Sequence, residues 1–509
     1  MLSTKKEVMD GLFICTSLSL FFILLIIIKF IFRTKQHLPP SPLTLPIIGH
    51  LHLLTPLPHR IFQQLSQKYG PVVSLWFGSR RVVVVSSSSV AEECFTRNDL
   101  VLANRPRFIL IGKHVGYNYT TVVVSPYGDH WRNLRRIGAT EIYSPSRLNM
   151  FSSTRKDEVK RLLFKLSHNS RKDFTKVDLR SMLSEMAFNI IMTMVAGKRY
   201  YGDGVSDNEE AKEFRDILSK IFLYAGATNP SDFMPILKWF GGGGFEKKLM
   251  ELGKRNDAFL QGLIDEQNLS KTTSDQSKAS TMIHHLLSLQ ESEPKYYTDE
   301  IIKGHILVML MAGTDSSSLT IEWAMSNLLN HPEVLKRARA ELDAEFGQEH
   351  LIDEPYIFKL PYLQSIISET LRLYPTAPLL MPHYSSDDCT IGGFDVPRDT
   401  MVMINAWAIH RDPKLWDDPE SFKPERFANG GEEPYKLMPF GQGRRACPGI
   451  ALAQRVVGLG LGSMIQCFEW ERVGDMKVDM SEGEGLTMPK AVPLEAMCKA
   501  RPLVDKVLF

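Results

Sequence analysis

The sequence predicts one large, mainly α-helical domain with small β-sheets, preceded by a transmembrane helix. Apolar residues recur every three or four positions over most of the 509-residue chain, a spacing typical of helices. Only two short valine-rich stretches, residues 72–77 and 81–86, have the composition of strands. Residues 12–32 form an apolar run long enough to cross a bilayer. We therefore expect a membrane anchor over residues 1–36, a proline-rich linker over 37–50 and one globular domain over 51–509.

The predicted anchor contains a single charged residue, Lys29, and no small-residue cleavage site follows it. A retained anchor therefore fits better than a secretory signal, whose apolar core is usually shorter. Arg33 and Lys35 follow the run and favour a cytosolic domain, although Lys5 and Lys6 on the other side weaken that argument. The prolines of the linker stiffen it and hold the domain near the membrane. Lipid is thus an expected partner, and an apolar substrate could enter from it.

Charge and cysteine content narrow the class of protein. The formal net charge of +2 at pH 7 gives no basis for nucleic-acid binding. The six cysteines are scattered, without a C-x-x-C pair or a Cys/His zinc spacing. This pattern fits free thiols in a reducing compartment.

Helical spacing and turn residues locate the main elements of the domain. Residues 72–77 and 81–86 should form a hairpin across Gly78-Ser79, because both stretches are short. Glycines at 241–244 and polar residues at 268–280 indicate loops, and residues 384–411 should close the small sheet. The expected helices are residues 51–69, 158–166, 177–195, 209–225, 245–267, 298–329 and 361–373, the last stopped by Pro375, and one from Ile450.

Residues 440–449 read FGQGRRACPG and contain one cysteine in a setting that should keep it ionised. Arg444 and Arg445 precede Cys447, and Pro448 suits the first position of the following helix. Cys447 should then lie at the helix N-cap, where the helix dipole favours negative charge. A thiolate is a soft ligand for which iron is a natural partner. The alternative is a buried structural cysteine beside a glycine-rich turn.

Residues 306–320 read ILVMLMAGTDSSSLT, an apolar helix interrupted by one glycine, one acid and several hydroxyls. Gly313 is unfavourable inside a helix by about 1 kcal/mol and therefore needs a reason. Hydroxyl groups can bond to backbone carbonyls and open a helix locally. We interpret the interruption as a groove in which Asp315 and Ser316 relay protons. The alternative is a polar helix face turned to water.

Two further sets of residues have a spacing that suggests a functional role, although each set alone is weak evidence. Trp131 and Arg135 lie four residues apart, on one helix face, where an arginine can bind carboxylates. Glu369 and Arg372 lie three apart, and Arg426 follows within the sequence PERF. On a surface such pairs contribute little, whereas a buried network must be complete.

Together these motifs resemble those of the cytochromes P450, in the order in which that family carries them, over almost the whole chain. The resemblance implies the P450 fold, with haem b (iron protoporphyrin IX) bound by Cys447 as the metal ligand. It makes Asp315, Ser316 and Thr314 the catalytic candidates, although the family usually has threonine where this chain has Ser316. It implies a buried lock of Glu369, Arg372 and Arg426 behind the cysteine loop. The implied cofactor-binding residues are Trp131, Arg135, Ala312, Gly313, His383, Phe440, Arg445, Cys447 and Gly449.

Three stretches are most similar to a plant microsomal group that includes isoflavone hydroxylases and lignan methylenedioxy-bridge synthases: residues 104–107, 127–135 and 486–491. This resemblance implies a single-pass protein of the endoplasmic reticulum membrane, with its catalytic domain in the cytosol. It implies a monooxygenase that receives electrons from NADPH through cytochrome P450 reductase. The small hydrophobic substrate would be a flavonoid or isoflavonoid, lignan, alkaloid or triterpenoid.

The resemblance also indicates where the substrate and the reductase bind. The expected pocket segments are residues 117–121, 308–313, 377–380 and 486–488, although ordinary core has the same apolar composition. Arg132, Arg136, Lys436 and Arg444 are candidates to face the acidic reductase. The alternatives are methylenedioxy-bridge formation, a P450-like isomerase or dehydratase that needs no dioxygen, and a haem- or lipid-binding scaffold without activity. The intact 312–316 motif argues against an isomerase.

Overall fold

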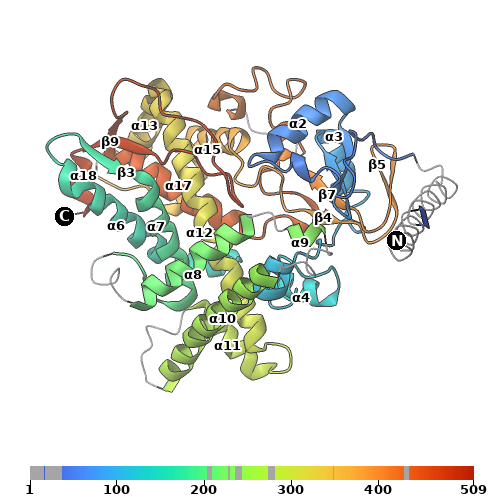
Figure 1. Cartoon of the computed structure of the whole chain (residues 1–509). Coiled ribbons are helices and arrows are strands. Elements are labelled where there is room, and N and C mark those ends of the chain that lie inside the picture. The colour runs from blue at the N-terminus through green and yellow to red at the C-terminus, as the bar shows by residue number, and fades with distance from the viewer. Residues whose placement is uncertain are drawn as a thin grey trace, which may run out of the picture.

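A computed structural model describes residues 16–17, 37–202, 209–226, 230–234, 243–272, 281–347, 349–428 and 435–508. Helices dominate, and Figure 1 shows the strands β4, β5 and β7 gathered with α2 and α3 on the side of the N-terminus. The larger helices are α2 (Pro58–Tyr69), α3 (Ser88–Phe95), α4 (Asp129–Ile137), α6 (Ser152–Ser170), α7 (Leu179–Ala196), α8 (Glu209–Gly226), α10 (Gly243–Thr272), α11 (Met282–Ser292), α12 (Asp299–Asn330), α13 (Pro332–Phe346), α15 (Pro361–Leu373) and α17 (Ile450–Cys467). The short helices are α5 (Pro145–Met150), α9 (Pro230–Phe233), α14 (Glu354–Ile357), α16 (Ala406–Ile409) and α18 (Leu503–Leu508).

The largest sheet has the strand order β1-β2-β7-β4, comprising Val72–Phe77, Arg80–Val85, Met401–Ile404 and His383–Tyr384. The predicted hairpin is confirmed: β1 and β2 are antiparallel, with Val72 opposite Val85. Strand β2 also pairs in parallel with β7, so it lies inside the sheet and its four valines are buried on both faces. The other sheets are β3-β9-β8 (Thr175–Asp178, Glu495–Ala500, Phe468–Glu471) and β5-β6 (Cys389–Ile391, Phe394–Val396).

Several predicted boundaries need correction for identifiable local reasons. The helix expected over 51–69 is a 3-10 turn at Leu51–Leu53 followed by α2, because Pro56 and Pro58 interrupt it. The helix expected from 177 begins at Leu179, since the side chain of Asp178 caps it by accepting a hydrogen bond from Ser181 N–H. Residues 241–242 and 273–280, within the two expected loops, lie outside the described residues. Residues 384–411 contain the predicted strands.

Helix α12 runs through the middle of the domain and is packed on α7, α15 and α17. The approach of α7 explains Gly313 differently from the predicted groove. A Cβ on Gly313 would lie 2.8 Å from Cδ1 of Ile191 on α7, so a larger residue there would force the Ile191 side chain to shift. Gly313 therefore permits close helix packing, and the helix continues through it without a break.

The predicted anchor over residues 1–36 lies outside the described residues apart from 16–17. Within the described part of the chain, one helix is long and apolar enough to cross a membrane, namely α17. Of its residues, 72% are buried inside the domain, where α17 packs against α6, α12 and α13. Helix α17 is therefore a core helix, which leads directly into the cysteine loop at its N-terminus.

Candidate functional site

The loop over residues 440–449 folds back on itself before α17. Gly441 and Gly443 both have φ of 69°, and the Cys447 N–H donates to the Phe440 carbonyl at 2.9 Å. A Cβ on Gly443 would lie 2.5 Å from a carboxylate oxygen of Asp99, so the close approach of that chain needs glycine. Helix α17 has Gly449 as its N-cap, and Pro448 therefore precedes the helix. The prediction that Cys447 itself is the N-cap is wrong by two residues.

Three influences act on the thiol of Cys447. Burial raises its pKa, whereas a hydrogen bond from the Gly449 N–H and the nearby charge of Arg135 both lower it. The net effect raises the pKa of Cys447, because burial outweighs the other two influences, so the groups of the protein alone do not keep this thiol ionised as predicted. The two arginines that precede Cys447 do not act on its thiol. Arg444 pairs with Asp99 at 2.8 Å, and Arg445 points into the domain. The cation that favours the thiolate comes from α4.

Arg445 and Trp131 hold one stretch of backbone between them. The Arg445 guanidinium donates to the carbonyls of Ala103 at 2.6 Å, Val122 at 3.1 Å and Ser125 at 2.6 Å. It lies 4.3 Å from the centre of the Trp131 ring, and the indole N–H donates to the same Val122 carbonyl at 3.0 Å. Both side chains therefore fix the 122–125 loop beside the cysteine.

Four basic side chains gather around this loop without a counter-ion. Burial lowers the pKa of Arg445 to about 9, and Arg105 and Arg135 lower it further. Burial likewise lowers the pKa of Arg105 to about 10 and that of Arg135. His383 has its pKa lowered to about 3, by burial and then by Arg105, and its Nδ1 bonds to the Leu102 carbonyl at 2.8 Å. No carboxylate of the described residues shifts the pKa of any of the four.

This cluster fits a cofactor that carries acidic groups. Nε of Arg105 is buried without a hydrogen-bond partner among the described residues, although its Nη1 donates to the carbonyls of Met381 and Pro382. The three buried arginines Arg105, Arg135 and Arg445, which have no carboxylate partner among the described residues, are costly until an anion joins them, whereas His383 is neutral. The two carboxylates of a porphyrin supply that anion, beside a thiol suited to bind its iron. Among the described residues, no group of three or more His, Cys, Asp or Glu side chains could hold a metal by itself.

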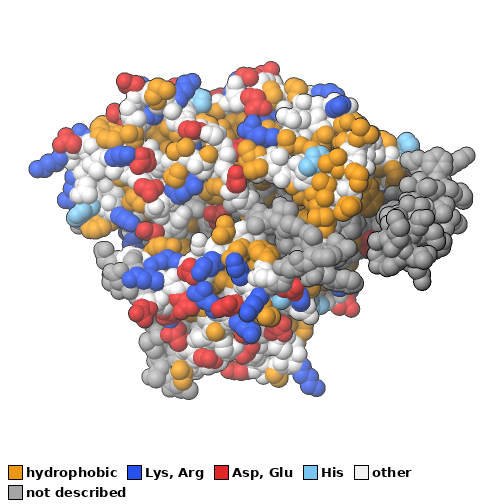
Figure 2. All heavy atoms as spheres, in the orientation of Figure 1, with side chains coloured by type: hydrophobic (Ala, Val, Ile, Leu, Met, Phe, Trp, Pro, Cys, Tyr) orange, Lys and Arg blue, Asp and Glu red, His pale blue; other side chains and the backbone are white. Residues whose placement is uncertain are grey.

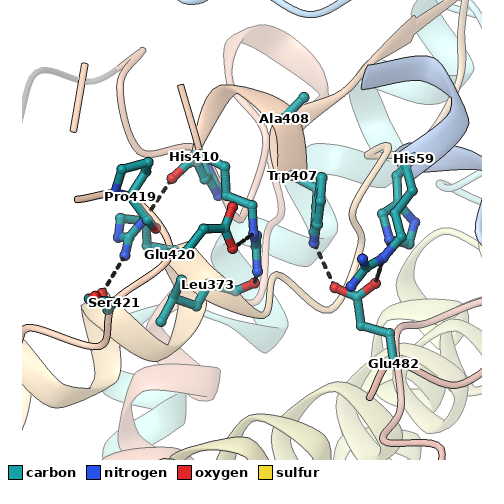
Figure 3. Close-up of polar contacts among 12 residues, drawn as sticks. His59, Leu373, Trp407, Ala408, His410, Pro419, Glu420, Ser421 and Glu482 are labelled. Carbon is teal, nitrogen blue, oxygen red and sulfur yellow. Dashed lines mark hydrogen bonds and ion pairs between the residues drawn. The ribbon is translucent and has the colours of Figure 1, made fainter. Parts of the chain in front are cut away.

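The predicted lock behind the loop is confirmed. Glu369 and Arg372 are fully buried and joined by two hydrogen bonds of 2.7 and 2.8 Å, and Arg426 reaches Glu369 at 3.3 Å. Arg372 also donates to the carbonyls of His410 at 2.8 Å, Pro419 at 2.7 Å and Ser421 at 3.1 Å, and Figure 3 labels these three acceptor residues. The network satisfies each charge, as a buried ion pair requires.

His410 connects this lock to the cysteine loop. Its Nε2 accepts a hydrogen bond from the Met438 N–H at 2.9 Å, and the Met438 carbonyl accepts one from the Gly441 N–H at 3.1 Å. Burial, then Arg411 and Arg372, lower the pKa of His410 to about 3, so it stays neutral and keeps an acceptor nitrogen. An unbroken chain of bonds therefore runs from Glu369 to the loop that carries Cys447.

The middle of α12 is open on one face. Ala312 is exposed although the helix is buried over most of its length. Ser316 lies one turn further along and donates its hydroxyl to the Ala312 carbonyl at 2.7 Å. Thr314 is buried away from this opening, and its hydroxyl donates to the Leu310 carbonyl at 2.8 Å. The structure thus brings Ala312 and Ser316 together on the open face and leaves Thr314 on the packed side.

The carboxylate of Asp315 meets a residue that the sequence did not single out as catalytic. Its Oδ2 accepts a 2.5 Å hydrogen bond from the hydroxyl of Thr487. Burial raises the pKa of Asp315, and the bond from Thr487 and the charge of Arg180 lower it again. Asp315 is therefore a half-buried acid whose proton affinity depends on a loop near the end of the chain.

Two of the segments expected to line a pocket contact α12, which itself contains the segment 308–313. Thr121 and Tyr117 lie 3.2 and 3.9 Å from the position of a Cβ on Gly304. The Met488 N–H donates to the Thr376 carbonyl at 3.0 Å, and the Met488 carbonyl accepts from Trp323 Nε1 at 2.9 Å. Met488 thus ties the segment 486–488 to α12 and to the residue directly before the segment 377–380.

The site contains a thiol directly before the buried helix α17, buried arginines that lack a carboxylate partner, and an exposed face on α12. Together these features are typical of a thiolate-haem protein. The comparisons with known proteins narrow this class. A sequence model of the family described as Cytochrome P450 matches residues 39–494. The chain belongs to the cytochrome P450 family, and its cofactor is haem b bound through a thiolate.

The relatives are plant enzymes. The chain is 59% identical over 477 residues to "Cytochrome P450 81Q32" of Catharanthus roseus, covering 94% of each chain. It is 56% identical over 504 residues to an isoflavone 3′-hydroxylase of Medicago truncatula, covering 98% of this chain and 100% of the other. A (+)-piperitol/(+)-sesamin synthase of Sesamum radiatum is 51% identical over 506 residues, covering 98% and 99%.

The fold is also that of solved P450 structures. A zebra fish cytochrome P450 with progesterone matches with a TM-score of 0.72 and 25% identity, covering 87% of this chain and 99% of the other. The protein is therefore a P450 monooxygenase of specialised metabolism. Enzymes of this class take electrons from a redox partner and bind small hydrophobic substrates.

Sequence reasoning missed three residues of this site. The three residues are Arg105, His410 and Thr487. Arg105 belongs to the family-like stretch 104–107, His410 to the segment 384–411 with its predicted strands, and Thr487 to the expected pocket segment 486–488. Their roles depend on contacts between residues 277, 28 and 172 positions apart in the sequence, respectively. A sequence signal existed for Arg105 alone, since an arginine followed by proline in a loop is an unusual buried cation.

Proposed function

We propose that this enzyme inserts one oxygen atom from dioxygen into a flat aromatic metabolite of the isoflavonoid, flavonoid or lignan type. The observation that carries the proposal is the exposed face of α12 at Ala312 and Ser316, together with the thiol of Cys447 beside the buried arginines Arg135 and Arg445. The printed activities of relatives at 51% and 56% identity support the substrate class. Alkaloids and triterpenoids are further possible substrate classes, because the expected pocket segments are apolar enough to bind them.

Each named side chain then has a role. Cys447 would ligate the iron, Arg135, Arg445 and His383 would hold the carboxylates of the haem, and Trp131, Phe440 and Gly449 would line its site. When bound, the haem supplies dioxygen binding and the oxidation chemistry. Asp315 takes up a proton and passes it to the open face, where the Ser316 hydroxyl holds it near Ala312. Thr314 and Gly313 support this region from the packed side of α12.

Ring closure is a second candidate outcome. The similarity to a (+)-piperitol/(+)-sesamin synthase favours it for a substrate that carries adjacent hydroxyl and methoxyl groups. Hydroxylation and bridge formation begin with the same hydrogen abstraction, so the residues above serve both. An isomerase or dehydratase is disfavoured, because the half-buried acid Asp315, beside Ser316 on α12, is useful when dioxygen must be protonated.

We infer that the protein sits on the endoplasmic reticulum membrane with its catalytic domain in the cytosol. Leu43 and Ile47 are 95% and 85% exposed, and Leu45 and Trp76 add to the same apolar area. Figure 2 shows hydrophobic side chains gathered on the side of the molecule near the N-terminus. An exposed patch of this kind usually marks a binding surface, and a bilayer suits one beside a predicted anchor. The anchor over residues 12–32 completes this proposal.

We also infer that NADPH–cytochrome P450 reductase binds around Tyr127. Arg132 and Arg444 lie 5.6 and 5.7 Å from the centre of the Tyr127 ring, and both are about half exposed. Arg136 is exposed one turn along α4 from Arg132. Lys436 lies apart, over the ring of Trp416. The three arginines form one cationic surface outside the cysteine loop, which suits an acidic partner.

The direct test is expression in microsomes with a plant reductase, followed by an untargeted screen of products from an isoflavonoid, flavonoid and lignan panel. We expect NADPH-dependent products that carry one added oxygen atom or a new methylenedioxy ring. Turnover of a hydroperoxide without NADPH, and no oxygenated product, would favour an isomerase. A normal haem spectrum without any product from the whole panel would contradict the proposed substrate class.

A further inference from the structure

Glu482 is a buried carboxylate that receives hydrogen bonds from two distant elements. Its side chain is 1% exposed, and its oxygens lie 2.9 Å from Nε2 of His59, 2.7 Å from Nε of Arg60 and 2.8 Å from Nε1 of Trp407. His59 and Arg60 belong to α2 and Trp407 to α16, and Figure 3 shows the side chains of His59 and Trp407 converging on Glu482. Burial raises the pKa of Glu482, but the hydrogen bonds and charges of His59 and Arg60 outweigh burial and hold it at about 2. Glu482 is therefore ionised near pH 7, and no role assigned above uses it.

Glu482 stands at the base of a hairpin-like loop, residues 482–490. Glu482 and Lys490 face each other in an antiparallel bridge, and the Gly483 N–H donates to the Pro489 carbonyl at 2.7 Å. A Cβ on Gly483 would lie 3.0 Å from the carbonyl oxygen of Lys490, so the two arms of the loop are packed closely. The loop is therefore one unit, and a movement of its base is passed on to its tip.

Trp407 connects the base of the 482–490 loop with its tip. Its Nε1–H is bonded to Glu482 at the base, and Met488 near the tip is 1% exposed and packs in one small apolar cluster with Trp407. The guanidinium groups of Arg411 and Arg60 lie 4.1 and 5.2 Å from the centre of the Trp407 ring. The bond to Glu482 thus fixes the orientation of an indole ring that supports both ends of the loop.

Thr487, directly before Met488, is the residue that this arrangement places. Its hydroxyl donates to the carboxylate of Asp315 at 2.5 Å. The backbone of Met488 is bonded to the Thr376 carbonyl at 3.0 Å and to Trp323 Nε1 at 2.9 Å, which brings the tip of the loop against α12. A hydrogen bond weakens steeply when its donor and acceptor move apart or out of line. A small displacement of the loop would therefore weaken the bond to Asp315.

Two groups oppose burial at the carboxylate of Asp315, and one of them depends on the loop. Burial raises the pKa of Asp315, whereas the hydrogen bond from Thr487 and the charge of Arg180 lower it. Arg180, on α7, is held by two bonds of 3.0 Å to Glu322 of α12, and it donates once to the Lys490 carbonyl at 3.0 Å. Bonds between two charged groups are the stronger ones, so α12 dominates the placement of Arg180. The Thr487 bond is the influence on Asp315 that the loop controls.

We propose that Glu482 is a positioning residue for the proton relay. It anchors the 482–490 loop on α2 and α16 and so holds the Thr487 hydroxyl against Asp315. Glu482 acts through the loop and not on the reacting atoms, and a shift of α2 relative to α12 is passed on to the relay. This inference rests on the proposed function, because proton transfer by Asp315 is part of that function.

The pH profile of coupling in the full-length, haem-loaded enzyme tests this inference. Product and hydrogen peroxide formed per NADPH are measured over a range of pH, with 7,4′-dihydroxyisoflavone as the probe. Glu482→Gln keeps the size of the side chain and removes its charge. We expect the midpoint of its profile to move to higher pH, as in Thr487→Val, because Asp315 without its hydrogen bond holds a proton more tightly. In the Thr487→Val background, Glu482→Gln should cause no further shift.

Glu354→Gln is the matched control, because Glu354 is also a buried carboxylate, 4% exposed, that pairs with Arg155 and Arg455. It should lower the thermal midpoint of the protein as Glu482→Gln does, but leave the midpoint of the pH profile unchanged. An equal shift in Glu354→Gln, or no shift in Glu482→Gln, overturns the inference. If Glu482→Gln does not fold, Arg60→Met replaces it, since Arg60 is about half exposed. Arg60→Met should shift the profile in the same direction by less, and no shift overturns the inference as well.

A second readout needs no turnover and separates this inference from the proposed function. In chemical denaturation, Thr487→Val should lose stability in a pH-dependent way in the wild-type background only, because Glu482→Gln has already removed the bond to Asp315. An equal pH-dependent loss in both backgrounds overturns the inference. A coupling profile that Asp315→Asn leaves unchanged contradicts the proposed relay, and a probe that is not converted contradicts the proposed substrate class. In both cases the denaturation test still decides whether Glu482 positions the loop.

Discussion

Thr487 donates a 2.5 Å hydrogen bond to the carboxylate of Asp315, across 172 positions of sequence. This bond joins the proton-relay region of α12 to the loop that we propose lines the substrate pocket. It opposes burial, which raises the pKa of Asp315. Substrate contacts with residues 486–488 and the protonation of Asp315 are therefore physically coupled.

The first prediction concerns Thr487→Val. Loss of the bond should raise the pKa of Asp315 further, because a hydrogen bond to the carboxylate favours its ionised form. A carboxyl group whose pKa is raised by folding loses stability as the pH rises from its unfolded pKa, about 3.9, through its folded value. The free energy of unfolding of Thr487→Val should therefore fall below that of the wild type more at pH 7 than in acid.

Chemical denaturation across this pH range is the measurement, and Asp315→Asn supplies the control. In the Asp315→Asn background the carboxylate is absent, so Thr487→Val should have an effect that does not vary with pH. An equal pH dependence in both backgrounds would refute the coupling.

The second prediction concerns Ser316. Its hydroxyl is held by the Ala312 carbonyl, but a serine rotates more freely than a threonine, whose branched Cβ restricts χ1. Ser316→Thr should tighten coupling, giving more product and less hydrogen peroxide per NADPH, and Ser316→Ala should loosen it. Peroxide release and NADPH consumption are measured together on one substrate. Equal leakage from all three proteins would exclude this role.

The third prediction concerns the link between the lock and the loop. His410→Leu removes the acceptor of the Met438 N–H and leaves that buried group unpaired, at a cost of about 1–3 kcal/mol. The cysteine loop should then hold the haem less well, so the variant should lose its thiolate-haem carbon monoxide band at lower temperature than the wild type. His168→Leu, which replaces an exposed histidine on α6, is the control and should lose the band at the same temperature as the wild type. A variant with the thermal profile of the wild type would show that the loop is held by other contacts.

The fourth prediction concerns the cationic surface. Arg136→Glu should weaken reductase binding several-fold at low salt, and the difference should shrink as salt screens the charges. The rate of the first electron transfer, measured against ionic strength, reports this effect. Lys160→Glu, a reversal of charge on α6, is the control and should change little. The reductase site lies elsewhere if Arg136→Glu leaves affinity and its salt dependence unchanged.

The sequence predicted the parts of the site that depend on local geometry. The three-residue spacing of Glu369 and Arg372 on one helix makes their pairing a local consequence, and the structure confirms it. The hairpin of β1 and β2 is local in the same way. The parallel partner β7 comes from more than 300 residues later, so no short-range signal could predict the burial of both faces of β2.

Side-chain direction was less predictable. Arg444 and Arg445 lie three and two residues before Cys447 in sequence, yet neither contacts the thiol. Arg444 pairs with Asp99, and Arg445 donates to three backbone carbonyls. Arg135, which lies on α4, is the cation near the thiol instead.

The central claim is that Cys447 is the thiolate ligand of the haem iron. The most direct measurement is the carbon monoxide difference spectrum of the reduced protein, recorded for the wild type, Cys447→His and Cys447→Ala. We predict the thiolate-specific Soret band in the wild type and its complete loss in both variants. A variant that keeps this band would contradict the assignment.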